Sequence, residues 1–143
     1  MPAVSWLPWS VDAFERARAE RRPVLLSIVT SWSQSCREMD DTTYADDVVV
    51  RTIEESFVPV RVDADRQPDI SDRYSLGGWP TTAFLTADGA LAGGGTFVSR
   101  ERMTSVLQKA AQAFTDKAAE IANVSATDSR RTGLTRAAAP SEA

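Results

Sequence analysis

Apolar positions along the first thirty residues follow two different periods, which predict a helix and then a strand. Residues 11–20 have apolar side chains at helical spacing behind Ser10, a favoured N-cap residue. Residues 24–29 are almost continuously apolar, which is typical of a strand covered on both faces of a sheet. The first thirty residues therefore have the pattern of a domain that combines helices with a buried sheet.

Two more helices and a second strand are expected next. One helix begins at or near Ser33, and another begins after Asp46, whose carboxylate suits an N-cap. The second strand covers residues 57–62 and contains Pro59. Because proline has no N–H to donate, one side of this strand must be unpaired or irregular at that position.

The second half of the chain has the pattern of a short helix, a loop, a β-hairpin and a long helix. The hairpin strands are residues 81–86 and 91–97. They are separated by Asp88-Gly89, a strong hairpin signal because both residues tolerate the positive φ angles of tight turns. A final helix is expected after Ser99. The whole order predicts an α/β fold, with a mixed central sheet and helices on both faces.

The chain has 143 residues, which suits a single domain with one hydrophobic core. We predict that this domain spans residues 1–118. Residues 119–143 are expected to hold the end of the last helix and then a disordered tail. The stretch from Val124 onward has no aromatic residue and is rich in Ser, Thr, Ala and Arg.

Charge and hydropathy narrow the possible partners. The net charge of −4 argues against binding nucleic acid through a broad basic face. No stretch approaches the ~20 apolar residues that a membrane span needs, so we expect no membrane partner. Residues 1–6 lack a basic segment followed by an apolar one, and we therefore expect no secretory signal and a cytoplasmic location.

Missing residue types exclude several kinds of site. The chain has no histidine and one cysteine, so it lacks the base of Ser-His-Asp and Cys-His sites and cannot form an intramolecular disulfide. These absences also argue against structural zinc. The acidic pairs Asp40-Asp41 and Asp46-Asp47 suggest either a hard-cation site or charges at helix starts. We favour the second reading and expect neither a metal nor a cofactor.

A candidate motif follows the first predicted strand, where the chain would pass into a helix. Its residues are Trp32, Ser33, Gln34, Ser35 and Cys36. A Trp-Cys-x-x-Cys sequence here would be a thiol–disulfide exchange site, in which the first cysteine attacks a disulfide and the second resolves the product. In this chain serine holds the attacking position, and its hydroxyl group is not ionised near neutral pH.

Three residues of the motif have both a structural and a chemical interpretation. Cys36 is either a small buried apolar residue or a single reactive thiol, and we favour the first because free cysteine is commonly buried. Ser33 is either a helix N-cap or a replacement for a catalytic cysteine. Trp32 can equally pack against the fold or contact a ligand.

Three blocks of sequence resemble the thioredoxin fold and, more specifically, the spermatogenesis-associated branch of thioredoxin-like proteins. The resemblance covers roughly residues 5 to 115, and its Val-Asp-x-x-x-x-Pro-Asp and Gly-Gly-Trp-Pro blocks are specific when found together. They are Arg22-Pro23-Val24-Leu25-Leu26, Val62-Asp63 with Pro68-Asp69, and Gly77-Gly78-Trp79-Pro80-Thr81. Many members of this branch have Cys-x-x-Cys where this chain has Ser33 and Cys36.

The resemblance implies specific roles for residues around the motif. Cys36 falls at the resolving position, and Ser27 falls where many thioredoxins have a buried aspartate. A cis peptide bond is implied between Trp79 and Pro80, facing the motif. Trp32, Trp79 and Pro80 then form the expected surface for a protein or peptide partner, since an extended chain can pair with a neighbouring backbone edge.

Three functions follow from this combination of a complete scaffold and an incomplete motif. The first is a non-catalytic module that binds a protein or peptide, which we favour. The second is a single-thiol redox enzyme that uses Cys36 as its catalytic residue. The third is a Cys-to-Ser form of a thiol–disulfide oxidoreductase, in which Ser33 replaces the attacking cysteine.

Overall fold

The computed structural model describes the backbone of residues 4–124 and the side chains of residues 4–115. The tail predicted beyond residue 124 lies outside the described residues. The elements, in chain order, are α1 (Val11–Glu20), β1 (Val24–Val29), α2 (Gln34–Asp41), the 3-10 helix η1 (Thr43–Ala45), α3 (Asp47–Ser56), β2 (Val58–Asp63), α4 (Pro68–Tyr74), β3 (Thr81–Leu85), β4 (Leu91–Gly95) and α5 (Arg100–Val124).

The four strands form one mixed sheet in the order β2-β1-β3-β4. Strand β1 lies in the middle, parallel to β2 and antiparallel to β3, and β3 pairs with β4 as a hairpin. Every residue of β1 except Val29 is buried, which explains its near-continuous apolar sequence. The predicted α/β fold with a mixed sheet is therefore confirmed.

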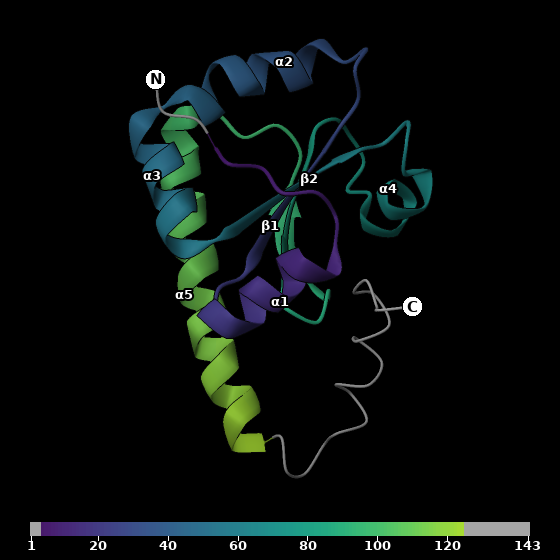
Figure 1. The fold of residues 1–143 in the computed structure, drawn as a ribbon. Helices are drawn as coiled ribbons and strands as arrows, with labels where there is room; N and C mark the ends of the chain where they lie inside the picture. The colour runs from purple at the N-terminus through teal and green to yellow at the C-terminus, as the bar shows by residue number, and fades with distance from the viewer. Residues whose placement is uncertain (1–3, 125–143) are drawn as a thin grey trace.

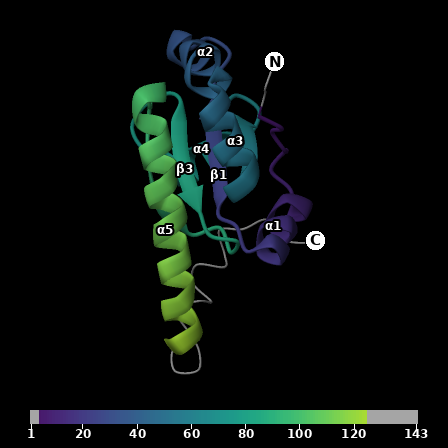
Figure 2. The same cartoon turned by 90° about the vertical axis from the view of Figure 1, so that its left-hand side faces the viewer.

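Helices cover both faces of the sheet (Figures 1 and 2), and each face has its own apolar cluster. Alternate residues of β1 divide between them, because successive strand side chains point to opposite faces. Leu26 packs with α1 and α4 on one face, whereas Leu25 packs with α3 and α5 on the other. The motif begins just past the carboxyl end of β1, at the end of the sheet where α2 lies (Figure 1).

Several predicted strand boundaries were wrong by one or two residues. The last strand ends at Gly95 rather than at residue 97, because the chain beyond it turns toward η1, where the Thr43 hydroxyl donates to the Val98 carbonyl at 2.6 Å. Phe57, expected in the second strand, is instead the C-cap of α3, and its N–H donates to the Ile53 carbonyl. The contact of Thr43 with Val98 joins segments far apart in the sequence, which periodicity does not encode.

Strand β4 approaches β3 too closely for a side chain at Gly94. A Cβ atom there would lie 2.2 Å from the Thr82 carbonyl oxygen and 2.9 Å from the Ala83 Cα atom, both backbone atoms that have little freedom to move. Gly94 also has a φ of 153°, which side-chain-bearing residues rarely adopt. Glycine is therefore required at this position by the path of the chain.

The outer edge of β2 is covered by the N-terminal segment, residues 4–7, which we call the strap. The Leu7 N–H donates to the Pro59 carbonyl at 2.9 Å, and the Arg61 N–H donates to the Leu7 carbonyl at 3.0 Å. Pro59 sits at this edge, where its missing N–H removes no bond to β1, as the sequence led us to expect.

Candidate functional site

Ser33 is the N-cap of α2, and its side chain is committed to that role. Its Oγ atom accepts a hydrogen bond from the Cys36 backbone N–H at 3.3 Å. This satisfies one of the amide groups that a helix start leaves unpaired. Ser33 is also buried, so its hydroxyl group is not presented to solvent.

Cys36 lies one turn into α2 and points toward the interior. Only 4% of its surface is exposed, and Met39, one turn further along the same helix, is fully buried. The two intervening motif residues lie outward, with Gln34 exposed and Ser35 half-buried. The single thiol of the chain is thus withdrawn from the surface on which the motif begins.

Trp32 and Trp79 form the exposed part of the site. Trp32 is 65% exposed, and its ring meets that of Trp79 edge-to-face, with the centroids 6.4 Å apart. The register of β1 with β3, in which Ile28 is opposite Thr81, brings the Trp79 loop beside the end of β1. The Trp79–Pro80 peptide bond is cis, and Pro80 is buried. The structure therefore brings Trp32, Trp79 and Pro80 together at one end of the sheet.

A layer of polar side chains lies behind the motif, on the α3 and α5 face. Ser27 is opposite Arg61 on β2 and opposite Thr82 on β3, so the three form one row across the sheet. The Arg61 guanidinium donates to both carboxylate oxygens of Asp40, at 2.7 and 3.0 Å, and to Ser27 Oγ at 3.3 Å. Asp40 belongs to α2, so this forked ion pair joins the motif helix to β2.

Two aromatic rings complete the surroundings of Arg61. The guanidinium carbon lies 4.3 Å from the Trp6 ring centroid and 5.6 Å from that of Tyr44, and the two rings meet edge-to-face. The Tyr44 hydroxyl and the Arg61 Nε atom are buried and make no hydrogen bond within the described residues. Burial raises the pKa of Tyr44 to about 12, although the charge of Arg61 opposes this change.

The Arg61 layer was not predicted from the sequence, although one signal pointed to it. Arg61 interrupts β2, whose other residues up to Val62 are buried. A charged residue within such a strand needs a partner. The sequence alone does not say which of the twenty acidic residues supplies it. Tyr44 lies in η1, a separate turn that follows the end of α2, where the Thr42 hydroxyl donates to the Glu38 carbonyl.

One residue of each acidic pair has a structural role, but Asp40 and Asp41 lie at the end of α2, so the expectation of a helix start was wrong for that pair. Asp46 accepts from the N–H groups of Val48 and Val49 and so caps α3, while Asp40 pairs with Arg61. Among the described side chains, those of residues 4–115, no group of three or more His, Cys, Asp or Glu residues is arranged to hold a metal ion. Among the described helices, none has the length and apolar character needed to cross a bilayer.

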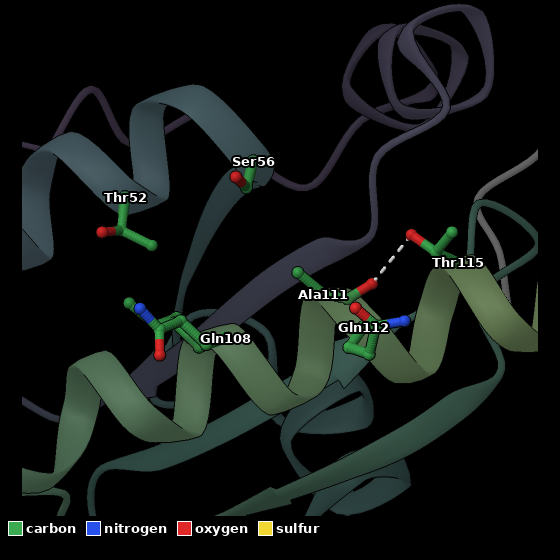
Figure 3. Close-up of a pocket in the computed structure, with 7 residues that line it drawn as sticks. Thr52, Ser56, Gln108, Ala111, Gln112 and Thr115 are labelled. Carbon is green, nitrogen blue, oxygen red and sulfur yellow. Dashed lines mark hydrogen bonds between the residues drawn. The ribbon is translucent and has the colours of Figure 1, made fainter.

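A shallow hollow of about 310 Å³ lies between α3 and α5 (Figure 3), but it makes a poor candidate site. It lies near Ser56, at the end of α3 that leads into the start of β2, and so at the opposite end of the sheet from the motif. The hydroxyls of Thr52 and Thr115 donate to carbonyls of their own helices rather than into the hollow. Its polar groups do not converge on a common ligand position.

Solved structures similar to this chain share its fold. One titled DsbH oxidoreductase superposes with a TM-score of 0.68 at 18% identity, covering 77% of this chain and 85% of its own. A thioredoxin from Thermus thermophilus superposes with a TM-score of 0.64 at 24% identity, covering 76% of this chain and 87% of its own. The thioredoxin-like architecture inferred from the sequence is confirmed.

Curated relatives are much longer than this chain. Human spermatogenesis-associated protein 20 is 34% identical over 106 residues, which cover 68% of this chain and 14% of that protein. The thiol:disulfide interchange protein DsbD of Ralstonia nicotianae is 37% identical over 82 residues, which cover 54% of this chain and 13% of that protein. The profile of the Thioredox_DsbH family, described as a protein of unknown function, DUF255, matches residues 1–132, and the chain belongs to this family within the thioredoxin-like thiol–disulfide exchange superfamily.

Proposed function

We propose that this chain is a non-catalytic binding module that holds an extended segment of a partner protein against Trp32, Trp79 and Pro80. One observation carries the proposal. The groups that would perform exchange are withdrawn, since Ser33 caps α2 and Cys36 is 4% exposed, while Trp32 beside them is 65% exposed. A large exposed indole next to a second indole offers contact area with little side-chain entropy to lose on binding.

The chemistry of Ser33 supports a role without disulfide exchange. Its hydroxyl group would need a general base to become a nucleophile, and the chain has no histidine. The Oγ atom already accepts a hydrogen bond from the Cys36 N–H. Exchange by Cys36 alone would require its thiol to reach solvent, from which the fold excludes it.

A titration with an unfolded polypeptide tests the binding role. The probe is reduced and carboxymethylated α-lactalbumin, which stays unfolded and has no free thiol. We expect the indole N–H resonances of Trp32 and Trp79 to shift on titration, while those of Trp6 and Trp9 stay in place. Trp32→Ala should weaken binding at least fivefold, and Phe97→Ala, which removes another exposed aromatic ring, should change it less. Equal shifts at all four indoles would contradict the proposal.

A second candidate function has support from the position of Ser33. A cysteine there would lie at the start of α2, where the helix dipole favours a thiolate, and relatives of the family include a thiol:disulfide interchange protein. The chain would then be a Cys-to-Ser form of an oxidoreductase. Reduction of insulin disulfides by dithiothreitol is the assay, comparing the present chain with Ser33→Cys.

The outcomes of that assay separate the two candidates. We expect no acceleration by the present chain, and the same result is expected for Cys36→Ser, because neither has a dithiol. Acceleration by Ser33→Cys that disappears in the double variant Ser33→Cys with Cys36→Ser would favour the second candidate. Failure of Ser33→Cys to gain activity would leave binding as the function that this scaffold serves.

A further inference from the structure

The strap lies against the opposite side of β2 from β1 and closes an edge of the sheet. Two backbone hydrogen bonds hold it, both centred on Leu7, whose N–H bonds to Pro59 and whose carbonyl bonds to Arg61. An uncovered strand edge presents unpaired N–H and C=O groups. Two backbone bonds alone would hold such a segment weakly, because each contributes about 1 kcal/mol net.

Trp6 supplies the main side-chain anchor of the strap. Its ring lies 4.3 Å from the Arg61 guanidinium carbon and meets the Tyr44 ring at 89°, with the centroids 5.0 Å apart. Stacking of arginine on an aromatic face is favourable, and more so where water is displaced. The Trp6 ring also shields the guanidinium from solvent, and only 22% of the Arg61 side chain is exposed.

The same guanidinium holds the motif helix in place. Its two terminal nitrogens bond to Asp40, which lies four residues after Cys36 and so on the same side of α2. Helix α2 lies at one end of the sheet (Figure 1), and its apolar anchor there is Met39, which packs in the core cluster with Leu25 of β1 and Phe84 of β3. The Arg61–Asp40 pair adds a polar tie between the sheet and the carboxyl end of the helix that buries Cys36.

We propose that the strap controls access to Cys36 through Trp6, Arg61 and Asp40. When Trp6 leaves its place, water reaches the Arg61 guanidinium and competes for its hydrogen bonds, which weakens the pair with Asp40. The carboxyl half of α2 then separates more often from β2, and the thiol of Cys36 becomes accessible. The strap, docked or released, is the element with two states, and Arg61 connects it to α2.

Alkylation of Cys36 by N-ethylmaleimide measures this opening directly, because Cys36 is the only thiol in the chain. We expect Trp6→Ala to raise the labelling rate without denaturant at least tenfold. That rate should depend little on low concentrations of urea, because a local opening exposes little surface. Trp6→Leu keeps apolar contact but removes the aromatic face, and it should raise the rate by a smaller factor.

Trp9→Ala is the matched control. Trp9 lies in the same N-terminal stretch and packs on Phe14 and Tyr74 over the other face of the sheet, away from Arg61. It should lower global stability without raising the urea-independent labelling rate. The proposal is overturned if Trp6→Ala accelerates labelling no more than its global unfolding equilibrium predicts, or no more than Trp9→Ala does at equal stability.

A double-variant measurement tests the connecting role of Arg61 and Asp40. Asp40→Asn should also accelerate labelling, and combining it with Trp6→Ala should add little, because both changes break the same connection. If the labelling rate of the double variant instead rises by the product of the two single-variant factors, Trp6 and Asp40 act independently. That result would contradict a strap that works through Arg61.

Discussion

The two sides of the motif differ in what their side chains are free to do. On the outer side, Trp32 is 65% exposed and meets the ring of Trp79 edge-to-face. On the inner side, Ser33 bonds to Cys36, and Arg61 bonds to both Asp40 and Ser27. The contrast teaches that this end of the fold leaves an aromatic surface exposed while its polar groups serve the structure. Changes to the inner side should therefore alter stability, and changes to the outer side should alter binding.

Among the groups of the inner side, ionisation of Tyr44 is expected to change the free energy of unfolding most. Its pKa is raised to about 12 in the fold, while an unfolded tyrosine ionises near 10. Below pH 10 the folded and unfolded chains both hold this proton, and stability is unaffected. Between pH 10 and 12 the unfolded chain releases it first, so stability falls by up to about 3 kcal/mol as pH rises.

Absorbance at 295 nm and urea unfolding at several pH values check this prediction. The chain has two tyrosines, so Tyr74→Phe leaves the ionisation of Tyr44 as the only tyrosine signal. Tyr44→Phe should remove most of the loss of stability above pH 10, even though it also removes a buried hydroxyl without a hydrogen bond. A Tyr44 phenol that titrates near pH 10 would show that the inner layer is open to water.

Arg61→Ala should have the next largest effect, a loss of about 2 kcal/mol in the free energy of unfolding. The change strands the Asp40 carboxylate and removes the cation on which Trp6 stacks. Arg18→Ala is the control, since Arg18 also pairs with an aspartate, Asp88, but keeps 62% of its side-chain exposure. We expect that control to cost less than about 0.5 kcal/mol in urea unfolding. Equal losses would show that the lower exposure of the Arg61 guanidinium gives its ion pair no added weight.

Ser33→Ala should cost about 1 kcal/mol, because the N–H of Cys36 loses its acceptor. Urea unfolding monitored by tryptophan fluorescence measures the loss, and Ser33→Asp, which restores an acceptor, should recover part of it. Binding of the unfolded probe should stay within twofold of the original. A large loss of binding in Ser33→Ala would mean that the inner and outer sides are not separable.

Trp32→Ala should have the smallest effect on stability, below about 0.5 kcal/mol, because the side chain is mostly exposed. Trp79→Ala should cost more, since Trp79 also packs against the core cluster beneath it. Circular dichroism melts of the two variants give the comparison. A larger loss for Trp32 would identify it as a packing residue rather than part of a binding surface.

Local signals in the sequence predicted the features of the site that depend on neighbours along the chain. The apolar run of β1 marks a buried central strand, and the side chains of Ser10, Ser33 and Asp46 cap helices because each lies two or three residues before free N–H groups. The Arg61 layer depends instead on strand register. Ser27, Arg61 and Thr82 become neighbours only when three strands far apart in sequence align.

The strap also escaped prediction for a physical reason. Residues 4–7 have no strand-like length, and their pairing to β2 rests on two backbone groups at the outer edge of that strand, the Pro59 carbonyl and the Arg61 N–H. Trp6 is recognisable in the sequence only as one of four tryptophans. Its distinct role follows from Arg61 lying beneath it, which is a property of the folded sheet.

The cap formed by Ser33 assigns one position of the chain to structure rather than to chemistry. Serine is a favoured helix cap, and its hydroxyl group is not ionised near neutral pH. A cysteine at a helix start would instead carry partial thiolate character, because the helix dipole lowers the pKa of a thiol there. The same position can therefore hold a fixed cap or a nucleophile, and serine commits it to the first.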